Sequence, residues 1–397
     1  MVNPMYLIAL FLAAAFLIAL VDKLHRKLSI FVQYGVMATA AGAAIWQLKM
    51  LHLIEPIKTV VVSAGFPAPL SIALKFGYVE AILVLLINIV GLLGAIYLYR
   101  EFEELGAQPI ALYLLVILGA NGLVLTRDIF NTFVFMEILS IATYALIALQ
   151  QDKKSLIAGI KYMLAGGLSS SIFLIGVVFA YRYTGTLNID TWIALPGLHS
   201  AGYQVAVFMV AMGVFLELKP FPANGWALDL YQSTHSGIGA IVSTVNTGAL
   251  LYLFYKIMPL FSPTLLAVLC GAGLVSFVMA NLLGLRQKSA KRLLGYSSTA
   301  QTGLIIFSLS ALYQLNLPSG MVLLTASGIL VTNFLAKATL FWLSGNLDKD
   351  ILGSWSALRN NDALLAMFSI AVIALMGFPP FPSFFAKWQL QIGRAHV

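Results

Sequence analysis

Long apolar runs constrain this chain more than any other feature of its sequence. They follow one another along the chain, and each could cross about 30 Å of hydrocarbon as a helix that rises about 1.5 Å per residue. Charged residues make up only 10% of the chain, whereas a soluble domain carries about a quarter. The sequence therefore predicts an all-α polytopic membrane protein.

The spacing of the runs predicts about twelve spans. They are Tyr6–Val21, Leu28–Leu48, Phe76–Leu98, Pro109–Leu125, Ile129–Leu149, Leu156–Ala180, Tyr203–Leu218, Ser236–Tyr255, Thr264–Leu285, Leu293–Tyr313, Met321–Leu343 and Ala363–Phe378. Basic residues are more numerous in the loops after odd-numbered spans, which the positive-inside rule assigns to the cytoplasm. These residues are Lys23, Arg26, Lys27, Arg100, Lys153, Lys154, Arg286, Lys288, Lys291, Arg292, Lys349 and Arg359. The opposite loops contain Lys49, Lys58, Lys75, Arg127, Arg182 and Lys256. We expect the N-terminus outside a cell inner membrane.

Two spans are interrupted by proline, in "LELKPFPANGW" and "LMGFPPFPSFFAKWQLQ". Proline removes a backbone donor, and such breaks in membrane helices usually line a cavity. Each break comes fourth in a five-span unit, which predicts two inverted repeats, as in many transporters. We expect N-terminal helices at 1–105, a first repeat at 106–260 and a second at 261–391.

The last six residues, "IGRAHV" at 392–397, resemble translated adapter sequence. If this segment is non-native, the second repeat lacks its last span and the natural chain continues.

Buried charges are the candidate functional residues. Glu137 lies nine residues past Asp128, near the centre of its span, where a carboxylate should face the bundle interior and have a partner. Lys219 lies at the first break, where a desolvated amine could accept and return a proton. Lys337 is too deep to reach the interface, and Asn333 could bond it.

Several other charges have competing explanations. Lys161 is close enough to its span's end to reach the interface, and Glu217 points to a different helix face from Lys219. His235 could be a helix cap, a packed ring or a relay. Glu80 fits an interfacial position, and Arg127 with the adjacent Asp128 fits a loop pair.

Several kinds of site are absent from the sequence. It contains no phosphate-binding loop, no paired metal ligands and no nucleophile triad, and the lone cysteine excludes an internal disulfide framework. We therefore expect no cofactor, no metal and no catalytic site of its own. The basic residues are explained by their loops, so nucleic acid is not an expected partner.

Five motifs in order resemble one family. They are "FMEILSIATYALIA", "AGIKYMLAGGLSSS", "KRLLGYSSTAQTG", "NFLAKATLFWLSG" and "GFPPFPSFFAK". They are similar to the proton-conducting, antiporter-like membrane subunits of respiratory complex I, Mrp-type sodium/proton antiporters and membrane-bound hydrogenases. The resemblance implies about fourteen helices and a relay through Glu137, Lys219, Lys337 and Lys387. It also implies partner membrane subunits.

The chain departs from that family in three places. Asn246 and Thr247 stand in the eighth span where the family usually has a lysine, and Asn333 stands where it has a histidine. The segment from Lys219 to Trp226 is two residues shorter than usual, which leaves open whether Glu217 or Lys219 is the functional residue.

Three functions fit these observations. The first is an ion-translocating subunit of a larger complex, a dehydrogenase, hydrogenase or antiporter, that moves protons, with sodium coupling left open. The second is an independent transporter of a small solute, although no arginine stands near the breaks to bind an anion. The third is a structural subunit that has lost transport, as the missing eighth-span lysine would allow.

Overall fold

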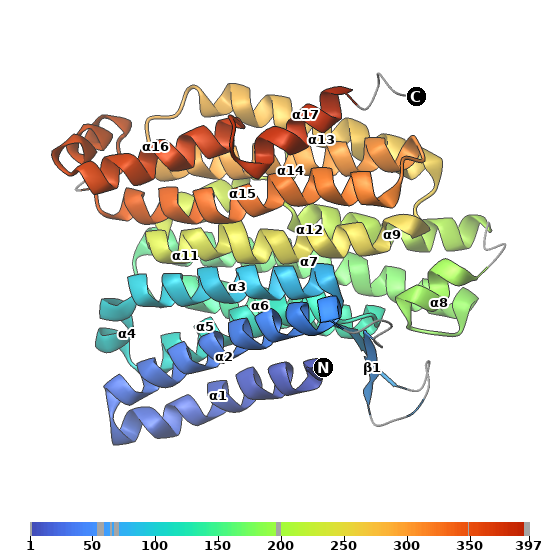
Figure 1. Cartoon of the computed structure of the whole chain (residues 1–397), viewed down its shortest axis with the longest axis horizontal. Coiled ribbons are helices and arrows are strands. Elements are labelled where there is room, and N and C mark those ends of the chain that lie inside the picture. Colours follow the sequence, from blue (N-terminus) through green and yellow to red (C-terminus); the bar gives the residue numbers. More distant parts are fainter. Residues whose placement is uncertain are drawn as a thin grey trace.

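The computed structural model describes residues 2–53, 59–63, 66, 71–195, 200–347 and 349–392. Within these residues, nine helices are long and apolar enough to cross a membrane, and Ala201–Glu217 and Asp362–Met376 are shorter apolar helices. The helices run side by side in one bundle (Figure 1). Each predicted run overlaps a helix, so the prediction of an all-α polytopic membrane protein is confirmed.

The elements follow the predicted runs closely. The first part contains α1 (Pro4–Leu24), α2 (Arg26–Leu53), β1 (Val60–Val62), β2 (Ala73–Lys75), α3 (Tyr78–Tyr97), α4 (Tyr99–Leu105), α5 (Ala107–Leu125), α6 (Ile129–Ala148), α7 (Lys153–Thr184) and α8 (Ile189–Ala194). The middle contains α9 (Ala201–Glu217), α10 (Gly225–Ser233), α11 (Ser236–Ile241), the π-helix η2 (Val242–Asn246), α12 (Thr247–Ile257) and η3 (Met258–Leu260). The last part contains α13 (Pro263–Gly284), α14 (Ala290–Gln314), α15 (Ser319–Gly345), η4 (Leu352–Asn360), α16 (Asp362–Met376) and α17 (Pro382–Ile392).

Short polar side chains determine where the long helices begin. Asp128, Asp152 and Ser262 each accept a hydrogen bond from the backbone N–H three residues further on, which satisfies a donor that the first helical turn leaves free. Asp128 is therefore the cap of α6. The expected loop pair with Arg127 is wrong, because the Arg127 guanidinium pairs instead with Asp190 at 2.7 Å.

The bundle has two distinct ends. At one end, which we call the hairpin end, β1 pairs antiparallel with β2, and Leu74 bridges to Thr126 after α5. The other, which we call the α4 end, holds α4 and η4 (Figure 1). Basic loops meet there, since Lys27 lies 3.9 Å from Glu103 and the Lys288 carbonyl accepts from Leu352 N–H. Lys58 and residues 393–397 lie outside the described residues.

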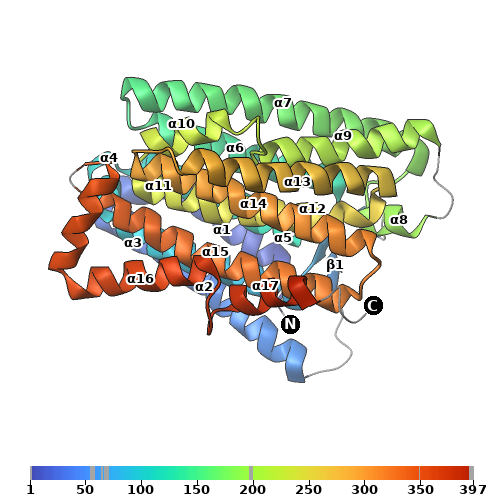
Figure 2. The same cartoon turned by 90° about the horizontal axis from the view of Figure 1, so that it is seen from above.

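The two interrupted helices lie on opposite sides of the bundle. Figure 2 shows α7 with α9 and α10 along one edge and α16 with α17 along the other, with α13, α14 and α15 between them. Close packing joins these layers. A Cβ at Gly303 of α14 would lie 2.7 Å from the Gly273 carbonyl of α13, so only glycine permits this approach. Small residues at such crossings are typical of membrane helices.

Candidate functional site: charged residues at the broken helices

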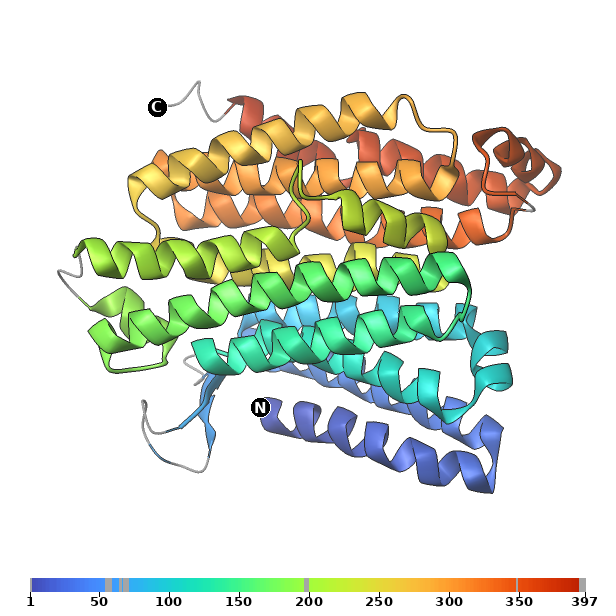
Figure 3. The same cartoon turned by 180° about the vertical axis from the view of Figure 1, so that it is seen from behind.

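The first break brings two opposite charges into the bundle. α9 ends at Glu217 and α10 begins at Gly225, and the loop between them is visible from behind in Figure 3. Pro220 and Pro222 cannot donate to a continued helix, which explains why α9 stops here. Lys219 has a positive φ of 58°, a conformation that costs a non-glycine residue about 1–2 kcal/mol. Strain of this kind at a charged residue points to a functional role.

Glu217 points toward α6 and α7. Its side chain is only 3% exposed, and its Oε1 accepts hydrogen bonds from Ser140 Oγ at 2.9 Å and from the Tyr162 hydroxyl at 3.0 Å. The Tyr162 ring stacks on Trp226 of α10, with centroids 4.6 Å apart. These two hydroxyl donors tie the Glu217 carboxyl to α6 and α7 inside the bundle.

Lys219 points the other way, toward α10, α12 and α14. It is 2% exposed, and its Nζ donates to the Tyr231 hydroxyl at 2.8 Å and to Thr247 Oγ1 at 2.6 Å. The Tyr231 oxygen lies 3.5 Å from Ser298 Oγ on α14. The amine is thus joined through hydroxyls, which can both donate and accept, to the neighbouring helix.

The π-helix η2 places polar groups opposite Lys219. Thr247 Oγ1 donates to the Val242 carbonyl at 2.9 Å while accepting from Lys219, and Asn246 Nδ2 donates to Thr143 Oγ1 at 2.9 Å. Single π turns inside α-helices are frequent at functional sites. Thr247 is one of the two polar residues that stand where the family usually has a lysine. Its hydroxyl accepts a hydrogen bond from Lys219 of the broken helix.

Glu137 occupies a different environment from the one expected. It lies near the middle of α6, but its side chain is partly exposed, and no hydrogen bond or ion pair joins it to another described residue. The expected partner is therefore not found among the described residues, and the role of Glu137 stays a prediction. At the first break, the enclosed carboxylate is that of Glu217, a secondary candidate in the sequence.

Lys337 is completely buried on α15. The structure gives its Nζ no hydrogen-bond partner among the described residues, and the same holds for Asn333 Oδ1, which the sequence suggested as its partner. Buried Thr299 and Thr302 on the adjacent α14 also have hydroxyls without a described partner. Buried polar groups in proteins normally bond to protein or water, so this region suits water.

Lys387 lies at the second break. Its Nζ donates to the carbonyls of Leu375 at 3.0 Å and Met376 at 3.1 Å, the last residues of α16. Gly377, with φ of 84°, turns the chain away from the helix there. The lysine therefore bonds carbonyls that the proline break leaves free.

Lys161 and His235 lie nearer the α4 end. Lys161 Nζ is 2.5 Å from Asp229, which also binds Arg292 at 2.9 Å, and the lysine side chain is about half exposed. His235 accepts from Gly237 N–H through Nδ1 and contacts Glu101 through Nε2 at 2.9 Å. An accepting Nδ1 leaves the proton on Nε2, which donates it to Glu101.

This histidine contact predicts a pH effect on stability. The hydrogen bond from His235 lowers the pKa of Glu101 on α4. A lowered pKa stabilises the fold above the unfolded pKa of about 4.3 and loses that effect as pH falls through the folded value. We expect Glu101→Gln to unfold at a lower temperature than the wild type at pH 7, with a difference that shrinks below about pH 4. Thermal unfolding of the purified protein across pH measures this.

The exposed Glu104→Gln is the matched control on the same helix. It should follow the wild-type curve at every pH. A Glu101→Gln difference that stayed constant from pH 7 to pH 3 would contradict the expectation.

Sequence reasoning missed the groups that hold the two charges at the first break. These groups are the hydroxyls of Ser140, Tyr162, Tyr231 and Ser298. Each bonds, directly or through one hydroxyl, to Glu217 or Lys219. A search for hydroxyls within the predicted apolar runs would have raised all of them except Tyr231, but their partners depend on how the helices pack.

Interrupted membrane helices with charged side chains enclosed at the breaks define a membrane protein of transporter type. The chain belongs to the NADH:quinone oxidoreductase/Mrp antiporter transmembrane family, which matches residues 126–393. The predicted family membership is thereby confirmed.

Relatives and solved structures agree with this membership. NADH-quinone oxidoreductase subunit N of Desulforudis audaxviator is 29% identical over 95% of this chain and 78% of the relative. A Na(+)/H(+) antiporter subunit of Alkalihalophilus pseudofirmus is also 29% identical, over 96% of this chain and 78% of the relative. A chain of the membrane-bound sulfane sulfur reductase, an archaeal respiratory membrane complex, superposes with a TM-score of 0.89 at 28% identity, covering 99% of this chain and 82% of that chain.

Proposed function

We propose that this chain is an ion-translocating membrane subunit of a larger complex and that it carries protons. The observation that carries the proposal is the pair Glu217 and Lys219. Both are buried, two residues apart, and they are hydrogen-bonded in opposite directions at a proline break. A charge enclosed at the middle of a membrane bundle is costly, and such residues usually mark ion pathways.

The contacts support a direction for the relay. Lys219 can pass a proton through the Tyr231 hydroxyl to Ser298 on α14, and hydroxyls of Thr299 and Thr302 continue along that helix. Lys337 follows on α15. We propose that water joins these groups and that Lys387 ends the relay at the second break. Lys161 and His235 are proposed as secondary groups near the α4 end.

We propose that the helices from 106 to 260 and from 261 to 391 are two inverted repeats. Both have an interrupted helix, α9–α10 and α16–α17, with a lysine at or after the break that bonds groups inside the bundle. In this scheme the α4 end faces the cytoplasm and the hairpin end faces outward, across the cytoplasmic membrane.

We propose that Glu137 pairs with a basic residue of a neighbouring subunit. Its carboxylate is partly exposed and has no ion pair with any described residue, and an unpaired charge within a membrane span is costly. The relatives supply the kind of partner, because they are subunits of a quinone oxidoreductase and of a sodium/proton antiporter. The alternative to proton transport alone is proton transport coupled to sodium.

The test is Glu217→Gln in the native complex, reconstituted in liposomes with a pH-sensitive dye inside. Glutamine keeps the size and accepts from Ser140 and Tyr162, but it carries no charge to hold the Lys219 proton nearby. We expect proton translocation to fall about a hundredfold. Complex yield should be unchanged.

The exposed Glu104→Gln serves as the matched control and should pump like the wild type. Normal pumping by Glu217→Gln would overturn the role of this carboxylate. A wild-type complex that moved no protons would overturn the proposed function itself.

A further inference from the structure

A second enclosed acid–base cluster lies at the hairpin end, away from both breaks. Glu80, near the start of α3, is only 2% exposed, although its position in the sequence suggested the membrane interface. Its Oε1 accepts from the Tyr252 hydroxyl of α12 at 2.6 Å, and its Oε2 accepts from Gly77 N–H at 3.1 Å. The carboxylate therefore joins α3 to the central helix that also bears Thr247.

Lys256 lies beside this tyrosine. Its Nζ is 5.3 Å from the centroid of the Tyr252 ring and donates to the carbonyls of Leu123 at 2.5 Å and Thr126 at 2.8 Å. These carbonyls end α5, where no further turn satisfies them. The sequence placed Lys256 in a loop, but the structure buries it in α12. Its amine donates to backbone oxygens and so ties α12 to the end of α5.

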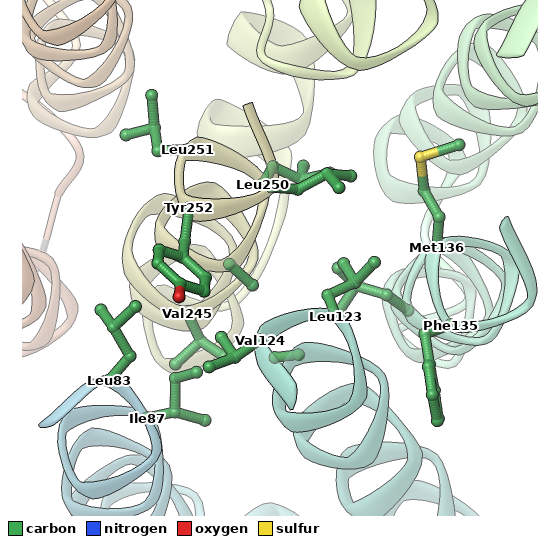
Figure 4. Close-up of a cluster of buried hydrophobic side chains, with 14 of the residues drawn as sticks. Leu83, Ile87, Leu123, Val124, Phe135, Met136, Val245, Leu250, Leu251 and Tyr252 are labelled. Carbon is green, nitrogen blue, oxygen red and sulfur yellow. The ribbon is translucent and has the colours of Figure 1, made fainter. Parts of the chain in front are cut away.

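Apolar side chains, here called the apolar layer, surround Tyr252, and only apolar residues, 248–251, stand between Tyr252 and Thr247, which bonds Lys219. Figure 4 shows the layer, with Leu83 and Ile87 from α3, Leu123 and Val124 from α5, and Val245 and Leu250 from η2 and α12. The Tyr252 ring extends from α12 into it, with the hydroxyl toward α3. Tyr252 comes five residues after Thr247, which is about 7.5 Å along the helix.

The outer side of Glu80 lies next to a cation of the hairpin. A Cβ built at Gly77 would be 2.9 Å from Glu80 Oε2 and 3.6 Å from Lys75 Cε. Lys75 belongs to β2 and is partly exposed. The cluster therefore leads from the apolar layer through Tyr252 and Glu80 toward Lys75 of the hairpin.

We propose that Glu80 and Tyr252 form a proton port at the hairpin end, in series with Lys219 across the apolar layer. The proposal rests on the proposed proton translocation. When the layer hydrates, the Lys219 ammonium releases a proton to a water chain, the chain delivers a proton to the Tyr252 oxygen, and the Tyr252 hydroxyl proton passes to the Glu80 carboxylate. Glu80 then releases the proton to water at the hairpin, so this port is a second outlet for the Lys219 proton beside the relay that ends at Lys387. Apolar constrictions of this kind gate by wetting and drying.

The competing explanation is that Glu80 only caps α3. It occupies the third helical position, and its carboxylate does bond the backbone of Gly77. A cap of this type works equally well with glutamine. Glu80→Gln therefore keeps the cap and removes the proton carrier, which separates the two explanations.

The experiment compares Glu80→Gln, Tyr252→Phe and Tyr255→Phe in the purified native complex in liposomes. Tyr255 is the matched control, because its ring lies 6.2 Å from that of Tyr252 and no hydrogen bond joins its hydroxyl to a described residue. We expect about a hundredfold slower proton translocation for the first two variants and wild-type rates for the third. Unfolding temperature should stay within a few degrees throughout. An infrared band that reports protonation of a carboxyl should be lost in Glu80→Gln.

Translocation within twofold of the wild type in both Glu80→Gln and Tyr252→Phe would overturn the port. An equal loss in Tyr255→Phe would also overturn it, because the effect would then come from packing. If Glu80→Gln failed to assemble, Tyr252→Phe alone would decide in the same way. A wild-type complex that moved no protons would overturn the proposed function and this inference with it.

Discussion

Lys219→Met is expected to stop proton translocation while the complex still assembles. Methionine fills the space of the lysine stem, but it cannot donate to Tyr231 or Thr247 and cannot hold a proton. Because the amine links α10, α12 and α14 through hydroxyls, we expect a loss larger than that of Glu217→Gln, at least about a hundredfold. Dye-monitored proton uptake by liposomes with equal amounts of complex measures it.

The exposed Lys154→Met is the matched control and should leave the rate unchanged. A second variant tests whether the strained backbone serves the side chain. Lys219→Gly relieves the positive φ and should unfold at a higher temperature than Lys219→Ala, with neither variant active. A Lys219→Met complex that pumped normally, or a smaller loss than in Glu217→Gln, would move the essential site to Glu217.

The sequence was sufficient to predict the spans, because a segment inside hydrocarbon must hydrogen-bond its own backbone groups and therefore forms a continuous helix. A helix long enough to cross the membrane appears in the sequence as a long apolar run. The bounds of α5 and α15 agree with the predicted runs within a few residues. The prolines likewise marked both breaks. The number of spans in the natural chain and the inverted repeats stay predictions.

The directions of the side chains could not be predicted in the same way. Glu217 and Lys219 are two residues apart, and a regular helix would separate them by about 200°. The chain leaves the helix between them, so their partners depend on the path of the loop and on which helices pack beside it. No periodic pattern encodes that Glu217 meets Ser140 and Tyr162 while Lys219 meets Tyr231.

The ends of helices misled the sequence interpretation for a related reason. Glu80 and Lys256 stand at the edges of apolar runs, where charged residues are usually solvated. The Tyr252 hydroxyl of α12 donates to Glu80, and the end of α5 offers carbonyls to Lys256, so both charges are enclosed. These contacts are between segments far apart in the chain and leave no local signal.

Lys337→Met is expected to abolish proton translocation and at the same time to raise the stability of the protein. The lysine is 0% exposed, and its amine has no hydrogen-bond partner among the described residues. Burying such a group costs free energy that an apolar side chain of similar length does not. We expect a gain of about 1 kcal/mol or more in the free energy of unfolding. Thermal unfolding and liposome pumping, measured on the same preparation, give both values.

The contrast between the two measurements separates a working group from a structural one. If the lysine served stability, its replacement would lower both the pumping rate and the unfolding temperature. If it serves proton transfer, its replacement lowers the pumping rate but raises the unfolding temperature, the usual trade-off at functional sites. The exposed Lys288→Met should change neither. If Lys337→Met both pumped normally and unfolded at a lower temperature, the amine would be a structural element of α15. The relay would then have to pass from α14 to Lys387 by another route.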